Sequence, residues 1–296
     1  MKVFVPPIKS QGIKTKLVPW IMSNLPEVHG RWIEPFMGTG VVGFNSGFKE
    51  AIFGDFNPHL IRFYEAVKQE VICARRVKEF LSVEAENLKN AADNGYAHYR
   101  LVRDRFNKDF QPLDFLFLSR AGFNGMIRFS KKGNWNIPFC KKPDRFRQAY
   151  ITKIVNQVSS LQKRMKPKWQ FIHQSFEDTI AMAKESDLIY CDPPYLGRHS
   201  DYYNSWNETH EALLFKCLSE TKAQFILSTW HSNAFRENTA IASYWNRFHM
   251  VTREHFYHAG AKEENRRMVT EALVMNFTPP KVEPDTKTIE CQMELV

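Results

Sequence analysis

The chain has 296 residues, with 41 Lys and Arg against 32 Asp and Glu, a formal net charge of +9 and a pI near 9.2. This length allows a full α/β core with a smaller attached domain, and the basic balance favours a polyanionic partner. There is no apolar run of about 18 residues for a membrane span, no signal peptide, and no Cys-x-x-Cys pair among the five cysteines. We therefore expect a cytoplasmic protein without a membrane anchor, a metal site or a disulfide framework.

The first predicted elements are a helix at residues 13–24 and a strand at residues 32–34. The loop after this strand reads Pro35-Phe-Met-Gly-Thr-Gly40. Its two glycines let the backbone pass close to a ligand where side chains would collide. The loop lacks the Gly-x-Gly-x-x-Gly pattern that cradles a pyrophosphate, which argues against a dinucleotide oxidoreductase.

The second strand, residues 51–55, ends on the acidic residue Asp55. An acid at this strand tip can bind both hydroxyls of a ribose, and the alternative is a cap or turn residue. Asn57 and Pro58 are suited to the N-cap and first position of a helix, which we expect at residues 58–68.

Residues 69–168 separate the second strand from the third, too long a stretch for a connection, and this predicts an inserted subdomain. It begins with a charged helix at residues 72–90. Between Pro112 and Lys153, nine basic residues stand against two acidic ones, and aromatic residues are interleaved with them. This pattern favours phosphate contacts combined with base stacking. The alternative is an aromatic core beneath a solvated basic face. The aromatic residues are Phe115, Phe117, Phe123, Phe129, Trp135, Phe139, Phe146 and Tyr150.

The third strand is expected at residues 170–173. The fourth, residues 188–192, ends in Asp192-Pro-Pro-Tyr195, which suits chemistry on the amine of a flat aromatic base. Such an amine is a poor nucleophile because its lone pair is delocalised into the ring. The Asp192 carboxylate and the Pro193 carbonyl could each accept one amine hydrogen and free the lone pair for attack. Tyr195 offers a face for stacking. An ordinary carboxylate pKa near ~4 makes Asp192 a weak base, so it acts chiefly as an acceptor. The alternative is a strand that merely ends in a proline turn.

The remaining strands are expected at residues 225–229, 249–255 and 272–277, with helices at 208–220 and 233–239. Alternation of strands and helices predicts an α/β fold with a parallel, doubly wound sheet. The last two strands have a short polar connection and should form an antiparallel edge hairpin. Residues 197–206 suit an active-site lid or a plain surface loop. From residue 279 onward the composition predicts a disordered tail.

These motifs and their order resemble the Dam-type (D12 class) adenine-N6 DNA methyltransferases, and among them the EcoRV-type modification enzymes, from about Val3 to Phe277. The N-terminal segment keeps Lys9, Gly12 and Lys14 of the family pattern, but Ser10 stands where many relatives have tryptophan. The resemblance implies a class I S-adenosylmethionine-dependent methyltransferase fold: a Rossmann-like, mostly parallel seven-stranded sheet with an inserted DNA-recognition subdomain. Residues 1–68 and 169–278 would form the catalytic domain and residues 69–168 the target-recognition subdomain, with a β-hairpin at about 120–138.

The resemblance also implies site residues. The expected catalytic residues are Asp192, Pro193, Pro194 and Tyr195. S-adenosylmethionine is expected to contact Lys14, Glu34, Pro35, Phe36, Gly38, Gly40, Asp55, Ser175, Phe176 and Asp192, although Phe176 could equally be an ordinary core residue. DNA is expected to contact Lys9, Arg120, Asn124, Arg128, Lys131, Lys132, Asn134, Trp135, Asn136, Lys141 and Lys142.

The sequence therefore predicts a site-specific methyltransferase of a restriction-modification system, acting on a flipped adenine in double-stranded DNA. The expected target is GATATC, with GATC as the alternative. The cognate restriction endonuclease would be a partner without a stable complex, and the enzyme a monomer in the cytoplasm, at the nucleoid. Two alternative interpretations of the sequence are an RNA adenine-N6 methyltransferase and a non-catalytic DNA-binding protein.

Overall fold

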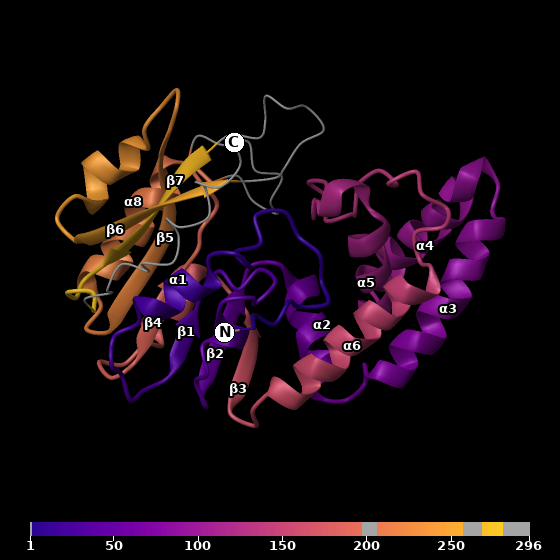
Figure 1. Cartoon of the computed structure of the whole chain (residues 1–296), viewed down its shortest axis with the longest axis horizontal. Helices are drawn as coiled ribbons and strands as arrows, with labels where there is room; N and C mark the ends of the chain where they lie inside the picture. Colours follow the sequence, from indigo (N-terminus) through magenta and orange to yellow (C-terminus); the bar gives the residue numbers. More distant parts are fainter. Residues whose placement is uncertain (1, 197–205, 257–267, 281–296) are drawn as a thin grey trace, which may run out of the picture.

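A seven-stranded sheet runs from the left of the molecule to its middle in Figure 1. The computed structural model describes residues 2–196, 206–256 and 268–280. The strands are β1 (Trp32–Glu34), β2 (Ala51–Asp55), β3 (Trp169–His173), β4 (Leu188–Cys191), β5 (Gln224–Asn233), β6 (His249–Phe256) and β7 (Met268–Met275). Their order is β3-β2-β1-β4-β5-β7-β6; the first five run parallel, and β7 is antiparallel to both β5 and β6. This confirms the predicted class I methyltransferase fold with its antiparallel edge hairpin.

The inner strands carry apolar residues on both faces, as expected for parallel strands covered by helices. β1 and β4 are buried along their whole length, and β2 is buried up to Asp55. Helix α2 (Pro58–Lys68) begins as predicted, because the Asn57 side chain accepts a hydrogen bond from the His59 amide at 3.0 Å. The carboxyl ends of β1, β2 and β4 therefore meet at one edge of the sheet.

Four helices of the inserted segment form a group beyond β3, on the side of the sheet opposite β6 (Figure 1). They are α3 (Ala74–Asn90), α4 (Tyr96–Asp109), α5 (Pro112–Ala121) and α6 (Gln148–Arg164), with short 3₁₀ turns η2 (Asp93–Gly95) and η3 (Phe123–Gly125). Helices α5 and α6 pack on α2, and one hydrophobic core extends from the sheet into the insertion. The insertion is thus built onto the sheet through a shared core, while the predicted domain division at residues 69 and 168 stays a prediction.

The other helices are α1 (Val18–Ser23), α7 (Phe176–Ala181) and α8 (Glu208–Glu220), with a 3₁₀ turn η1 (Gly43–Asn45) and a π turn η4 (Ile241–Trp245). Helix α1 starts five residues later than residue 13, where we expected it.

The predicted helix at residues 233–239 is wrong, because β5 continues to Asn233 through backbone pairing with β7 across a bulge between Trp230 and Ser232. The predicted lid and tail fall at residues 197–206 and from 279 onward, and nearly all of both segments lies outside the described residues.

Candidate active site

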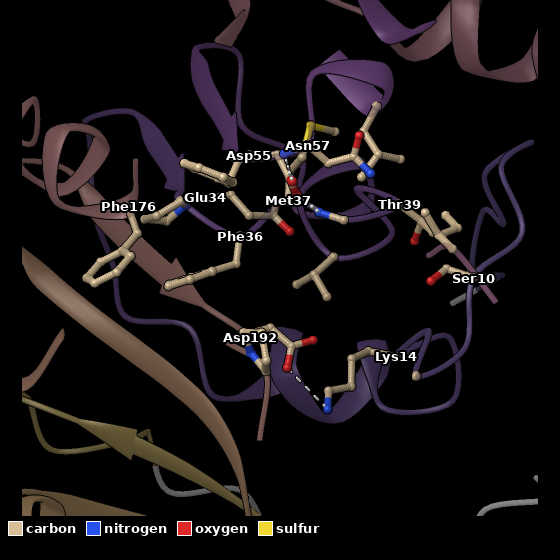
Figure 2. A pocket seen from close by; sticks show the side chains of 18 of the residues that line it. Ser10, Lys14, Glu34, Phe36, Met37, Thr39, Asp55, Asn57, Phe176 and Asp192 are labelled. Carbon is tan, nitrogen blue, oxygen red and sulfur yellow. Dashed lines mark hydrogen bonds and ion pairs between the residues drawn. The ribbon is translucent and has the colours of Figure 1, made fainter. Parts of the chain in front are cut away.

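A cavity of about 280 Å³ opens at the carboxyl ends of β1, β2 and β4 (Figure 2). Its walls come from the N-terminal segment, the glycine loop after β1, the start of α2, the start of α7 and the segment after β4. Nine of the ten residues predicted to contact the cofactor line this cavity: Lys14, Glu34, Pro35, Phe36, Gly38, Asp55, Ser175, Phe176 and Asp192. Parallel topology explains the convergence of eight of them, since strand ends of one polarity share one edge, whereas Lys14 comes from the N-terminal segment before α1.

Asp192 follows the last residue of β4 and projects toward the cavity on the side opposite Asp55 (Figure 2). Its Oδ1 atom lies 3.3 Å from Nζ of Lys14, and its side chain keeps 23% of its surface exposed. The pKa of Asp192 is raised to about 6, because burial raises it strongly, the Lys14 ammonium lowers it and the Glu271 carboxylate raises it. This corrects the ordinary pKa expected from sequence. Asp192 is still ionised at neutral pH and can accept hydrogen bonds.

Tyr195 is held by a network that the sequence analysis missed. Its hydroxyl donates a hydrogen bond to Oε2 of Glu271 at 2.7 Å and accepts one from Nζ of Lys14. The Lys14 ammonium also lies 4.6 Å from the centroid of the Tyr195 ring. Glu271 is on β7, fully buried. An acid next to the apolar run Ala272–Met275 is the signal that could have identified it.

Asp55 ties the glycine loop to the start of α2. Its Oδ2 atom accepts a hydrogen bond from the Gly38 amide at 2.8 Å, and its Oδ1 atom accepts one from the Asn57 amide, also at 2.8 Å. Burial raises the pKa of this carboxyl to about 6, although both amides act in the opposite direction. Asp55 therefore has the predicted alternative role of a turn residue, and it also faces the cavity.

The two loop glycines have different roles. Gly38 has a φ of +49° and faces open space, because a Cβ built on it would meet no atom within 4 Å. Gly40 has a φ of +71°, and a Cβ there would lie 2.5 Å from the Phe44 ring. Gly40 is absent from the cavity lining and packs against the 3₁₀ turn η1 instead. Gly38 leaves room for a ligand, whereas Gly40 allows the tight turn behind it.

Three aromatic side chains form one wall of the cavity. The rings of Phe36 and Phe176 stack at 5.3 Å between centroids, and Trp206 meets the Phe36 ring edge-on at 5.5 Å. The Trp206 indole donates a hydrogen bond of 2.6 Å to the buried Glu211 of α8. Phe176 is both a core residue and a cavity residue, so its two predicted roles coexist. His210 also lines the cavity, and neither it nor Trp206 was predicted as a cofactor contact.

Two further predicted residues, Ser175 and Glu34, accept hydrogen bonds within the protein. The Ser175 hydroxyl caps α7 by accepting a hydrogen bond from the Asp178 amide at 3.1 Å. Glu34 accepts a hydrogen bond of 2.8 Å from the Trp32 indole, and burial raises the pKa of Glu34 well above its ordinary value. Both residues therefore line the cavity and also stabilise its wall.

The predicted recognition hairpin is a short antiparallel excursion between α5 and α6. Phe129 and Trp135 form an isolated bridge, and the Asn136 amide donates to the Arg128 carbonyl at 3.2 Å. Gly133 turns the chain with a φ of +77°, which favours glycine at this position. The Arg128 guanidinium donates a hydrogen bond of 2.8 Å to the Asn136 side chain across the hairpin.

Two of the predicted DNA contacts are buried in the structure. Trp135 is 1% exposed, with its indole bonded to the Tyr99 hydroxyl at 2.9 Å. Arg120 is 5% exposed on α5 and donates to the Pro7 carbonyl and to the Gln157 side chain. Both are buried because they join segments of the core. Nine predicted contacts remain at least partly exposed: Lys9, Asn124, Arg128, Lys131, Lys132, Asn134, Asn136, Lys141 and Lys142.

The aromatic residues of this basic stretch differ in how far the fold buries their side chains. Phe115, Phe117, Phe129, Trp135, Phe139 and Phe146 are buried, so the alternative of an aromatic core beneath a basic face is confirmed for them. Phe123, by contrast, is 52% exposed beside Asn124. The exposed surface of the hairpin is therefore basic and polar, with Phe123 as an apolar residue near its base.

Within the described ranges, no group of three or more His, Cys, Asp and Glu side chains is arranged to hold a metal ion. Over the same part of the chain, no helix is long and apolar enough to cross a membrane.

Among known proteins, the relatives described below are named as methylases or methyltransferases. The chain is 33% identical over 192 residues to a DNA adenine methylase of Vibrio cholerae, and the alignment covers 64% of each chain. It is 26% identical over 288 residues to the type II methyltransferase M.FokI of Planomicrobium okeanokoites, covering 92% of this chain and 43% of that one. The chain thus spans less than two thirds of the length of either relative.

Among solved structures, the rRNA methyltransferase aviRa from Streptomyces viridochromogenes aligns over 92% of this chain and 86% of its own. Its TM-score of 0.34 and identity of 11% are too low to bear on function. The family described as D12 class N6 adenine-specific DNA methyltransferase matches residues 10–259, nearly the whole chain. The resemblance to the D12 class is confirmed, and the chain belongs to the D12 class of N6 adenine-specific DNA methyltransferases.

Proposed function

We propose that this protein transfers a methyl group from S-adenosylmethionine to the N6 amine of an adenine in double-stranded DNA. The observation that carries the proposal is that Asp192 and the glycine loop open into one cavity, with Asp55 on the opposite wall. In our assignment, residues 1–68 and 169–278 form the catalytic domain and supply every residue of the cavity lining except Ile127, and residues 69–168 supply target recognition.

The cavity residues fit the cofactor. Asp55 presents a carboxylate at the tip of β2, where it can accept hydrogen bonds from ribose hydroxyls in addition to its two amide bonds. The open space above Gly38 admits a chain that needs close backbone approach. Phe36 and Phe176 offer apolar faces for an adenine ring. When bound, S-adenosylmethionine supplies an electrophilic methyl group on a sulfonium.

Asp192 acts as the hydrogen-bond acceptor for the target amine. Above about pH 6 its carboxylate is ionised, and it withdraws one amine proton toward itself while the Pro193 carbonyl accepts the other. These two acceptors localise the nitrogen lone pair and direct it away from the ring. Pro193 and Pro194 restrict the backbone, so the acceptors keep their orientation. The Tyr195 ring, held through Lys14 and Glu271, provides a surface for the base.

Recognition of duplex DNA is assigned to the hairpin. The exposed bases Lys131, Lys132, Lys141 and Lys142 suit phosphate contacts, which give affinity without base preference. Arg128, at the side of the hairpin, is the residue we assign to guanine. A restriction-modification context is supported by the similarity to a type II methyltransferase. The GATATC target, with GATC as the alternative, comes from the resemblance to EcoRV-type enzymes.

Methyl transfer to genomic DNA, followed by sequencing that maps N6-methyladenine, tests activity and target together. We expect the wild-type protein to modify one palindromic site containing GAT. We expect the Asp192→Ala variant to leave this site unmodified. Total RNA serves as the parallel substrate. Transfer to RNA at a higher rate than to duplex DNA would contradict the assignment of the substrate, and methylated cytosine would contradict the assignment of the base.

A further inference from the structure

Glu271 is a carboxylate buried inside the sheet. It lies on β7 opposite Trp230 of β5 and Arg253 of β6, and its side chain is 0% exposed. Burying a charged carboxylate is costly unless hydrogen bonds and opposite charge compensate it. The next residues of the strand, Ala272–Met275, are apolar and buried, so a strand built only for packing would carry an apolar residue at position 271 as well.

The partners of Glu271 belong to the proposed catalytic machinery. The Tyr195 hydroxyl donates to its Oε2 atom at 2.7 Å, and Nζ of Lys14 lies 3.5 Å from the same atom. The same Lys14 nitrogen lies 3.3 Å from Oδ1 of Asp192. One ammonium is thus placed between two carboxylates, and the tyrosine hydroxyl bonds to both Lys14 and Glu271.

We propose that Glu271 is a positioning residue for methyl transfer, which holds Tyr195 in place and shares Lys14 with Asp192 so that Asp192 remains free to accept the target amine. This inference rests on the methyl transfer proposed above. It links the edge hairpin of the sheet to Asp192-Pro-Pro-Tyr195.

The physical reason is competition for the Asp192 oxygens. A lysine that pairs closely with a carboxylate occupies its lone pairs and makes it a weaker acceptor. Glu271 attracts the same ammonium from the other side, which limits how closely Lys14 pairs with Asp192. The two carboxylates and one ammonium also carry a net charge of −1, which favours the cationic amine formed when a methyl group is added.

The charge of Glu271 has a measurable consequence for Asp192. The groups facing Asp192 are Lys14, which lowers its pKa, and Glu271, which raises it above the value set by burial. Glu34, Tyr190 and Cys191 also lie close enough to interact with the Asp192 charge. On the far side, His255 of β6 interacts with Glu271. Removing the Glu271 charge should therefore lower the pKa of Asp192 from about 6.

The sign of the pH effect follows from this. Asp192 must be ionised to accept the amine, so kcat of the wild-type enzyme falls as pH drops through about 6. In Glu271→Gln the carboxylate stays ionised to lower pH, and the acid limb of the kcat profile moves to lower pH. The plateau of kcat should nevertheless decrease by about 10-fold or more, because Asp192 is held more tightly by Lys14 and Tyr195 loses a charged acceptor.

The experiment compares wild type, Glu271→Gln and Glu271→Asp with Glu254→Gln, a matched control on the neighbouring strand β6 whose side chain is exposed. We measure kcat against pH on duplex DNA, and we titrate Asp192 directly by NMR with ¹³C-labelled aspartate. The Asp192 resonance is assigned by its loss in Asp192→Asn. The titration needs no turnover, so it separates failure of this inference from failure of the proposed function.

We expect Glu271→Gln to lower both the kcat plateau and the pKa of Asp192, and Glu254→Gln to change neither. Glu271→Asp retains the charge but shortens the side chain, so it should lose turnover while Asp192 titrates near its wild-type pKa; this variant decides the question if Glu271→Gln does not fold. Wild-type kcat in either Glu271 variant would overturn the inference. An unchanged Asp192 titration in folded Glu271→Gln would overturn it as well.

Discussion

The cofactor edge of the sheet and the recognition hairpin are built in opposite ways. At the sheet edge, Asp55 and Asp192 stand directly at or after strand ends, and backbone topology alone brings them to one cavity. In the hairpin, basic and aromatic residues are interleaved, and side-chain packing decides which are exposed. A motif at a strand end therefore carries positional information, whereas a biased composition indicates only the type of residue.

The two regions also differ in what stabilises them. The cavity wall is fixed by polar bonds to the backbone, such as those from Gly38 and Asn57 to Asp55. The hairpin is anchored by apolar burial, with Trp135 and Ile137 each 1% exposed. Changes at hairpin anchors should therefore reduce stability, and changes at cavity carboxylates should reduce activity or cofactor affinity while the fold persists.

The largest effect is expected at Trp135. Trp135→Ala removes a buried indole and its bond to Tyr99, and should lower the free energy of unfolding by about 3–5 kcal/mol. Denaturant unfolding measures this, with exposed Asn134→Ala as a control that changes stability by no more than about 0.5 kcal/mol. A Trp135→Ala protein of wild-type stability with weakened DNA binding would restore Trp135 as a DNA contact.

At the sheet edge, Asp192→Ala should leave the fold intact and reduce methyl transfer by about 10²–10³-fold or more, because one acceptor for the amine is lost. Single-turnover rates at saturating cofactor and DNA measure the change. Asp104→Ala, at a carboxylate that is 59% exposed on α4, is the matched control. Near-normal turnover in purified Asp192→Ala would contradict the proposed mechanism.

Asp55→Ala should weaken the cofactor more than the DNA. The loss of charge-assisted hydrogen bonds at the tip of β2 should cost roughly 1.5–3 kcal/mol of S-adenosylmethionine affinity. Isothermal titration calorimetry measures this affinity. Asp55→Asn keeps one acceptor oxygen, so its affinity should lie between those of wild type and Asp55→Ala. If calorimetry shows unchanged affinity, Asp55 serves only to tie Gly38 to Asn57.

The smallest expected effects distinguish base reading from phosphate contact within the hairpin. Arg128→Ala should remove roughly 1–3 kcal/mol of discrimination at one base pair. Lys141→Ala should weaken all sequences alike and reduce the salt dependence of binding. Competition binding with single-substitution duplexes at two salt concentrations tests both predictions. Arg128→Lys is the control for charge, because lysine keeps the positive charge but cannot form the bidentate contact of arginine. A uniform loss of affinity in Arg128→Ala would mean that the hairpin positions DNA without reading it.

Local sequence patterns were sufficient to predict the strands of the sheet, the helix at Pro58–Lys68 with its Asn57 cap, and the placement of Asp192 at a strand end. These follow from local patterns, since strand periodicity, capping and proline act over a few neighbouring residues. The direction of the parallel strands then brought eight of the nine cavity-lining residues predicted for the cofactor to one edge without knowledge of side-chain packing, and Lys14 reaches the cavity from the N-terminal segment.

Features that depend on contacts between distant segments became known from the folded structure. Glu271 meets Tyr195 across 76 positions of the chain, and Arg120 meets Pro7 across 113. Trp135 is buried by helices that precede it, and β5 extends to Asn233 because β7 pairs with it. In each case a side chain or a backbone edge is satisfied by a partner far away in sequence, and local pattern holds no information about that partner.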